Sequence, residues 1–276
     1  MKRYSLESVK LDIESFFNDD DHWSCKYGSK PTSCHKNSVF YKRQLQIIFE
    51  DMYPHDITGK AVNGLIKEGF LLSEHYSFGN NMHAIFIWRH NVRYVARDIK
   101  LKASIMEKFS ADELNDGAGK YAESLFLHMV QKNQFNILDR DANMLGEARW
   151  TFSDKNLDFI IEKDGLRYGV EIKNTFDYMP QAEFEEKIKM CKFLGLIPLF
   201  PLRFSSPLQH QLMKVEGGLA LIFKSRIFPP GNQKLVTEIW NHFRLPVTIW
   251  ESIQPHVENN FLSFHQRSLI RCGNRQ

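Results

Sequence analysis

The sequence predicts a mixed α/β protein with two domains, residues 1–110 and 111–276. Apolar residues at helical spacing dominate the first part, which then continues into a hairpin pattern. Near the middle of the chain, two strand-like arms flank the turn signal Lys163-Asp164-Gly165. Helix-like and strand-like runs alternate after it, an order typical of helices packed on a sheet. We therefore expect a sheet flanked by helices in the second domain and a smaller helical domain before it.

The composition is that of an ordinary globular protein, with 43% hydrophobic and 25% charged residues among 276. The longest apolar run, residues 193–202, is about half the roughly 20 residues that a membrane helix needs. Acidic residues occupy the N-terminal stretch where a signal peptide needs an apolar segment. The 4 cysteines are scattered, which fits a reducing compartment better than a disulfide framework. These features predict a cytoplasmic protein without a membrane segment.

The charge distribution allows a nucleic-acid partner without requiring one. The formal net charge is +3, and residues 1–110 hold the whole excess, with 16 Lys and Arg against 13 Asp and Glu. Basic patches on a nearly neutral body are compatible with phosphate binding, although a solvated face is the commoner explanation.

Two helices and a hairpin are expected in the first domain. Residues 40–53 have helical spacing that Pro54 ends, and a second helix over residues 57–70 follows after a possible cap at Asp56 or Thr58. Strand-like runs at residues 70–78 and 82–90 are joined by a good turn sequence, and a basic helix over residues 91–109 leads to the second domain.

This order of helix, turn, helix and hairpin resembles a winged helix-turn-helix domain. In such domains the second helix enters the DNA major groove and the hairpin touches the backbone or minor groove. A small helical module that mediates protein contacts is the other interpretation. The candidate DNA contacts on the exposed side of the second helix are Thr58, Lys60, Asn63, Lys67 and also His55.

The two arms of the central hairpin carry charged residues that can converge. Side chains alternate faces along a strand, so Glu171 and Lys173 share one face about 7 Å apart. Asp158 begins the first arm and can approach Glu171 if the arms pair in a suitable register. Two carboxylates suit Mg²⁺, and a nearby lysine could hold or deprotonate a water for phosphodiester hydrolysis. The apolar residues of the second arm fall on the opposite face: Tyr168, Val170 and Ile172.

Asp158, twelve further residues and then Glu171-Ile172-Lys173 resemble the motif of the PD-(D/E)XK nuclease superfamily. Leu157 stands at the position of the family's proline. The family often has a glutamate on a preceding helix, and Glu123 lies in the amphipathic stretch of residues 117–133. Elsewhere, Glu-x-Lys is most often a charged strand edge. Helices and strands that fit the family core are expected at residues 181–195, 197–204, 208–214, 219–223, 232–243 and 246–252.

The resemblance implies a restriction-endonuclease-like mixed central sheet flanked by helices. It also implies a metal held by Asp158, Glu171 and the Ile172 carbonyl, with Lys173 on the attacking water and Glu123 as an outer ligand or water-positioning group. We expect a Mg²⁺-dependent endonuclease, with Mn²⁺ able to substitute, that acts on double-stranded DNA as a homodimer. A Holliday-junction resolvase or repair nuclease, or a DNA-binding regulator that does not cut, is the alternative.

Two further groups of residues carry weaker signals. His22, Cys25, Cys34 and His35 are possible zinc ligands, although their spacing is not that of a recognised structural site. Gln181 and Lys189, on the helix after the hairpin, could reach the site, but solvated helix charges are the simpler interpretation.

Overall fold

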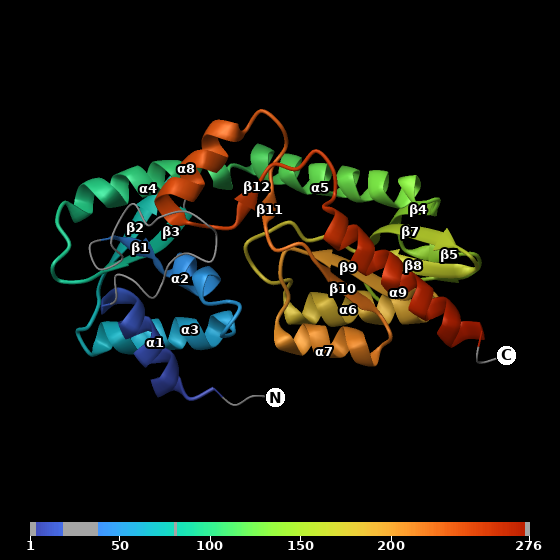
Figure 1. The fold of residues 1–276 in the computed structure, drawn as a ribbon, viewed down its shortest axis with the longest axis horizontal. Helices are drawn as coiled ribbons and strands as arrows, with labels where there is room; N and C mark the ends of the chain where they lie inside the picture. Colours follow the sequence, from blue (N-terminus) through green and yellow to red (C-terminus); the bar gives the residue numbers. More distant parts are fainter. Residues whose placement is uncertain (1–3, 19–37, 80–81, 274–276) are drawn as a thin grey trace. The chain divides into compact units, whose positions relative to one another are not determined.

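The computed structural model describes residues 4–18, 38–79 and 82–273 (Figure 1). The chain forms two compact units. Unit 1 contains Met1–Ala111 and Thr237–Leu245, and unit 2 contains Asp112–Val236 and Pro246–Gln276. The sequence placed the boundary after residue 110 but gave no sign that a later segment returns to unit 1.

Unit 1 packs helices against a small antiparallel sheet with the strand order β1-β3-β2. Its core contains the aromatic residues Phe16, Phe17, Phe40 and Phe49, which meet edge to face. Its elements are α1 (Leu6–Asn18), β1 (Phe40–Tyr41), α2 (Lys42–Ile48), α3 (His55–Lys67), β2 (Leu72–Phe78), β3 (Met82–Trp88), α4 (Val95–Ser110) and the greater part of α8 (Gln233–Phe243).

The expected helix over residues 40–53 is shorter in the structure. Its first two residues form β1, where Phe40 pairs with Ile87 and Tyr41 with Phe86, so a long-range sheet contact overrides the local helical spacing. The second expected helix is present as α3, and Gly69 follows it with φ +75°, the left-handed conformation common after helix ends. Helix α1 was not predicted.

The segment Thr237–Leu245 completes the core of unit 1. Phe243 is fully buried and meets the rings of Tyr41 and Phe109 edge to face. The Gln44 side chain donates a hydrogen bond to the Phe243 carbonyl, and Lys102 Nζ donates one to the His242 carbonyl at 2.7 Å. Both donors therefore satisfy carbonyl groups at the end of α8 that have no partner within the helix.

Unit 2 is built around a mixed five-stranded sheet with the order β10-β9-β8-β7-β4. Strands β4 and β8 both run antiparallel to β7, which lies between them, whereas β8, β9 and β10 are parallel to one another. Its elements are α5 (Asp112–Lys132), β4 (Asn136–Ala142), β5 (Met144–Leu145), β6 (Ala148–Arg149), β7 (Leu157–Lys163), β8 (Leu166–Val170), α6 (Gln181–Phe193), β9 (Ile197–Leu202), α7 (Pro207–Val215), β10 (Leu219–Ile222), β11 (Arg226–Ile227), the start of α8, β12 (Val247–Thr248) and α9 (Pro255–Gly273).

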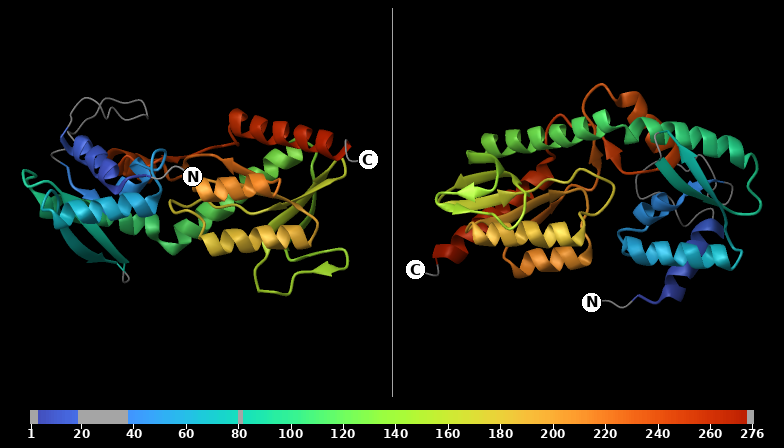
Figure 2. Two further views of the ribbon diagram at one scale, coloured as in Figure 1. Left: turned by 90° about the horizontal axis from the view of Figure 1, so that it is seen from below. Right: turned by 180° about the vertical axis from the view of Figure 1, so that it is seen from behind.

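Helices cover both faces of this sheet (Figure 2). One hydrophobic cluster joins α5 and α9 to residues such as Phe159 and Tyr168. A second cluster joins α6 and α7 to residues on the other face, such as Ile160 and Phe200. The predicted mixed α/β class and mixed central sheet are therefore confirmed.

The central hairpin forms where its turn chemistry predicted. Asp164 and Gly165 both have positive φ, 52° and 75°, as a two-residue turn of type I′ requires. The apolar residues of the second arm lie in the cluster that contains α5 and α9, while Gly169 faces Cys191 of α6. The predicted alternation of faces along β8 is thus confirmed.

Other expected elements differ from the structure. The expected final strand over residues 246–252 is only the two-residue β12, which pairs with β11 outside the main sheet. Strand β4 and helix α9 were not predicted. None of the helices in the described parts of the chain is both long enough and apolar enough to span a bilayer.

Candidate active site

The strand register brings Asp158 to Glu171. Phe159 pairs with Val170 across β7 and β8, and continuing this register by one pair sets Asp158 opposite Glu171. The Asp158 Oδ2 atom accepts a hydrogen bond from the Ile172 N–H at 2.5 Å. The side chain of Asp158 thus occupies the place where the two arms of the hairpin separate, and it fixes the backbone next to Glu171.

The backbone after β8 is held on its other side by β9. The Glu171 N–H donates to the Leu199 carbonyl at 3.3 Å, and the Lys173 N–H donates to the Pro201 carbonyl at 3.0 Å. The Arg203 N–H donates in turn to the Lys173 carbonyl at 3.0 Å. Because the segment stays extended, the side chains of Glu171 and Lys173 both point to the face that α6 covers.

Helix α6 adds two charged residues that the sequence did not single out. Lys187 Nζ lies 2.6 Å from Glu171 Oε2, and Glu183 Oε1 lies 2.8 Å from Lys173 Nζ. Lys173 Nζ also lies 3.5 Å from Glu171 Oε1. These four residues form a continuous ion-pair network of two carboxylates and two ammonium groups, which we call the α6 network.

One sequence signal could have identified Lys187. The buried stripe of α6 contains Phe184, Lys187, Ile188 and Cys191, so a lysine stands at a position that helical spacing gives to an apolar residue. Gln181 and Lys189, the two residues of this helix that the sequence analysis considered for the site, do not join the α6 network. Gln181 donates to Glu185 one helical turn away, and Lys189 is exposed.

Asp158 is electrostatically strained in this setting. Its burial, together with the charges of Glu171 and Glu123, raises the pKa of its carboxyl to about 7. The Ile172 N–H and the Lys187 ammonium oppose this increase in the pKa of Asp158 without cancelling it. The Asp158 carboxyl thus holds its proton more strongly than an exposed aspartate does.

Glu123 of α5 belongs to the same electrostatic cluster. Its partial burial raises its pKa, as do the charges of Asp141 and Glu171, while Lys120 and Lys173 act in the opposite direction. Helix α5 therefore brings the predicted third carboxylate within electrostatic range of the other two.

Lys173 is a stable cation in this site. Burial alone would lower its pKa, but the hydrogen bond that Lys173 donates to Glu183 and the charges of Glu171, Glu183 and Asp158 raise the pKa overall. The sequence left open whether this lysine holds or deprotonates a water. A raised pKa favours hydrogen-bond donation and positive charge over action as a base.

The donor set fits a magnesium ion in part. Asp158 and Glu171 supply carboxylate oxygens, and Mg²⁺ commonly takes only one or two protein carboxylates together with waters. In the described residues, no three or more His, Cys, Asp or Glu side chains are grouped so as to hold a metal ion. Glu123 is thus linked to the pair by charge, and its expected role as a metal ligand is not supported. The role of the Ile172 carbonyl stays a prediction.

Asn174 fastens the site to two neighbouring elements. Its side-chain amide donates to the carbonyls of Ala118 in α5 and Ile227 in β11, and its oxygen accepts from the Ile227 N–H at 2.8 Å. This buried residue therefore fixes the end of the Glu171–Lys173 segment relative to the helix that carries Glu123.

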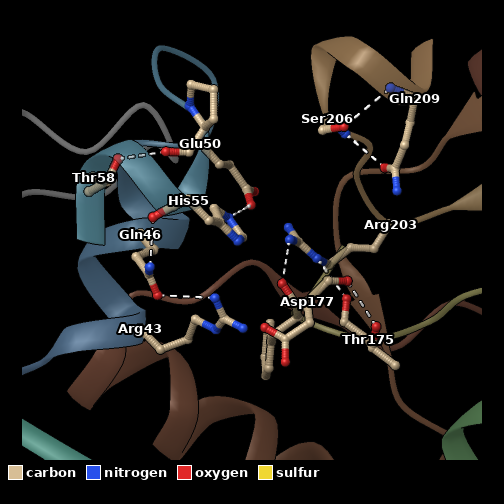
Figure 3. Close-up of polar contacts among 12 residues, drawn as sticks. Arg43, Gln46, Glu50, His55, Thr58, Thr175, Asp177, Arg203, Ser206 and Gln209 are labelled. Atoms are coloured by element: carbon tan, nitrogen blue, oxygen red, sulfur yellow. Dashed lines mark hydrogen bonds and ion pairs between the residues drawn. The ribbon is translucent and has the colours of Figure 1, made fainter. Parts of the chain in front are cut away.

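A buried arginine orders the loop that follows Asn174. Arg203 donates to the carbonyls of Thr175 and Phe176 at 2.9 and 2.8 Å (Figure 3). Ser206 and Gln209 then form a reciprocal capping box at the start of α7. The loop after the site is thus held by Arg203, a side chain that the sequence analysis did not name.

The candidate DNA contacts of α3 are only partly exposed. Lys60, Asn63 and Lys67 are exposed, and the Asn63 side-chain oxygen accepts a hydrogen bond from Lys42. The expectation for Thr58 was wrong, because it is fully buried and its hydroxyl donates to the Pro54 carbonyl (Figure 3). His55 is likewise buried, with its ring 3.2 Å from Glu50 Oε2.

The possible zinc ligands His22, Cys25, Cys34 and His35 lie outside the described residues.

Comparisons of the chain with protein-family models, with curated proteins and with solved structures found no match.

Proposed function

We propose that this protein is a divalent-cation-dependent DNA endonuclease of the PD-(D/E)XK type, which hydrolyses phosphodiester bonds. The observation that carries the proposal is the register of β7 and β8, which sets Asp158 opposite Glu171. Lys173 lies on the same face as Glu171, at an Nζ–Oε1 distance of 3.5 Å. The helix, hairpin and mixed sheet around these residues support a restriction-endonuclease-like fold for unit 2.

The chain's own residues would divide the work of hydrolysis as follows. Asp158, Glu171 and the Ile172 carbonyl would hold Mg²⁺, or Mn²⁺ in its place, and the ion would stabilise charge on the phosphate in the transition state. Lys173, which keeps its positive charge, would donate a hydrogen bond to the attacking water or to a phosphate oxygen. The half-buried Glu123 would position a water molecule at the edge of the site.

Unit 1 would bind duplex DNA. Its order of helix, helix and hairpin supports a winged-helix role, and the exposed Lys60 and Lys67 of α3 suit contacts to phosphates. Replacing either lysine by alanine should weaken binding to all duplex sequences and reduce the salt slope of log affinity by about 1. One active site per chain would require a homodimer, or two successive nicks, for double-strand cleavage.

A plasmid assay with purified protein tests the proposal. We expect Mg²⁺-dependent nicking or cutting that a chelator abolishes and that Lys173→Ala reduces at least 100-fold. The matched control is Lys189→Ala, an exposed lysine of α6 outside the α6 network. If the wild-type protein cuts no duplex, nicked or branched DNA in Mg²⁺ or Mn²⁺, the nuclease proposal is wrong.

A DNA-binding protein that does not cut is the second candidate. It is favoured by the ion pairs themselves, because Lys173 is paired with Glu183 and Glu171 with Lys187. Retained duplex binding without cleavage in the same assay would support this candidate. Cleavage of branched DNA in preference to linear duplex would instead indicate a junction resolvase or repair nuclease with the same chemistry.

A further inference from the structure

Lys187 is a buried cation that the proposed reaction does not use. Its side chain is 6% exposed and that of its partner Glu171 is 3% exposed. Lys187 Nζ lies 2.6 Å from Glu171 Oε2 and also donates to the main-chain carbonyl of Asn156, two residues before Asp158. The ammonium group is therefore bound by oxygens from both arms of the site, and it lowers the pKa of Asp158 by its charge.

This environment is similar to that of a bound metal ion. Carboxylate and carbonyl oxygens around a buried positive charge are what a hard cation requires. Most lysines avoid such positions, because removing an ammonium group from water is costly unless a partner balances it. Here the ammonium neutralises a carboxylate that would otherwise be buried without a full counter-charge, since Lys173 divides its charge between Glu171 and Glu183.

The carboxylates around Lys187 outnumber the ammonium groups of the α6 network. Four carboxylates interact with one another or with the two ammonium groups of the α6 network, and burial and neighbouring negative charge raise the pKa of two of them, Asp158 and Glu123. A divalent cation would supply further positive charge to this cluster. The four carboxylates are those of Glu123, Asp158, Glu171 and Glu183.

We propose that Lys187 is a built-in counter-cation: its ammonium balances the buried Glu171 carboxylate while no divalent cation is bound, and its charge lowers the affinity of the site for one. The inference rests on the cation-binding part of the proposed function and not on cleavage. Removing this charge should make the fold depend on an added cation. A lysine that served only to fill space in α6 would have no such effect.

Thermal unfolding of the full chain tests the counter-cation. Lys187→Met keeps the length of the side chain and removes its charge, and we expect the Tm without divalent cations to fall by about 10 °C. Mg²⁺ should restore at least half of this loss, a larger increase than in the wild-type protein. Lys189→Met, an exposed lysine on the same helix, is the control and should change neither value.

A double variant separates charge from packing. Lys187→Met combined with Glu171→Gln removes both charges, so its Tm should return to within a few degrees of the wild-type value and no longer respond to Mg²⁺. If the double variant is as unstable as Lys187→Met alone, the role of Lys187 is packing and the proposal is overturned. This comparison also holds if Lys187→Met does not fold without a cation.

Direct binding of Mn²⁺, followed by electron paramagnetic resonance, gives a second readout. Lys187→Met should bind Mn²⁺ about tenfold more tightly than the wild-type protein, because a positive charge beside the ligands has gone. Equal or weaker binding by the variant would overturn the inference, as would the absence of binding in both proteins. A wild-type protein that binds Mn²⁺ but cuts no DNA would refute the nuclease proposal alone.

Discussion

Gly169 allows α6 to lie close enough to the sheet for Lys187 to reach Glu171. A Cβ atom at this position would lie 2.6 Å from Cys191 Sγ and 2.9 Å from Leu157 Cδ1. Both distances are shorter than atoms tolerate, so only glycine permits this separation of helix and strand. Because glycine has no Cβ atom, it lets α6 pack closely against β8 next to the site.

Gly169→Ala should therefore destabilise the protein by about 1–3 kcal/mol, the usual cost of overpacking a core. Urea unfolding measures the change, and adding Cys191→Ala should recover part of the loss because it removes the nearest atom. Gly117→Ala is the matched control: its added Cβ meets no atom within 4 Å in helix α5, so we expect stabilisation of up to about 1 kcal/mol. Equal effects of Gly169→Ala and Gly117→Ala would contradict this account.

Lys102 should make stability depend on pH. Burial lowers its pKa from 10.5 to about 7, and Asp98 opposes this shift only weakly. Between about pH 7 and 10.5 the unfolded chain then binds more protons at this group than the folded chain. The free energy of unfolding should accordingly rise with pH in this window, by up to about 1.4 kcal/mol per unit.

Denaturant unfolding across this pH range isolates the contribution of Lys102. Lys102→Met should remove that part of the slope, while Lys100→Met, an exposed neighbour on α4, should leave it unchanged. A wild-type slope that survives in Lys102→Met would show that another group causes it.

At the scale of elements, α9 is fastened to the hairpin by a chain of polar contacts. The Tyr168 hydroxyl lies 2.8 Å from His265 Nδ1, and His265 Nε2 lies 3.1 Å from Asp164 Oδ2 in the hairpin turn. Tyr168 and His265 are buried, whereas the Asp164 side chain is half exposed. The contact between Tyr168 and His265 should therefore contribute most to stability.

His265→Leu should cost about 1–3 kcal/mol, because it leaves the buried Tyr168 hydroxyl without its ring-nitrogen partner. Asp164→Asn should cost less than about 1 kcal/mol, because its contact is exposed to water. The two variants can be compared by urea unfolding. A larger loss for Asp164→Asn than for His265→Leu would mean that the turn, rather than the core contact, holds α9.

Local patterns explain which elements were predictable. The hairpin was predictable, because Asp164-Gly165 is suited to a tight turn and side chains alternate between the two faces along its arms. Helix α3 was predictable as well, because Pro54 precedes it and Gly69 follows it. The pairing of Phe40 and Tyr41 with β3 was not predictable from local patterns, since it depends on residues more than 40 positions away. Elements whose identity is decided by distant partners are those that local spacing misassigns.

Local patterns also explain which residues of the site were predictable. Asp158, Glu171 and Lys173 were identified because they share a strand pattern, and the hairpin register then follows from the turn. Glu183 and Lys187 were missed because their partners lie on another element. Thr58 was placed on the wrong side of α3, because the sequence did not show which face of that helix meets the core.

For the whole molecule, the return of the chain to unit 1 matters more than the boundary near residue 111. Thr237–Leu245 supplies Phe243 to the core of unit 1, while the residues on either side of the segment belong to unit 2. A fragment of residues 1–111 would therefore lack Phe243, one of the aromatic residues in the core of unit 1. No local signal predicts this, since Phe243 lies at a core position in the helical spacing of α8 whichever unit that helix packs against.

Hydrogen exchange of the full chain should show to which unit each core residue belongs. Phe243→Ala should cost about 3–5 kcal/mol and reduce amide protection in α4 and β3, because its ring packs on Phe109 and Tyr41 in unit 1. Phe261→Ala is the reciprocal variant: this equally buried ring packs on Phe135 and Tyr168, so protection should fall in β7 and β8 instead. If Phe243→Ala reduced protection in β7 and β8 as strongly as in α4, the two units would unfold together and the segment would stabilise both.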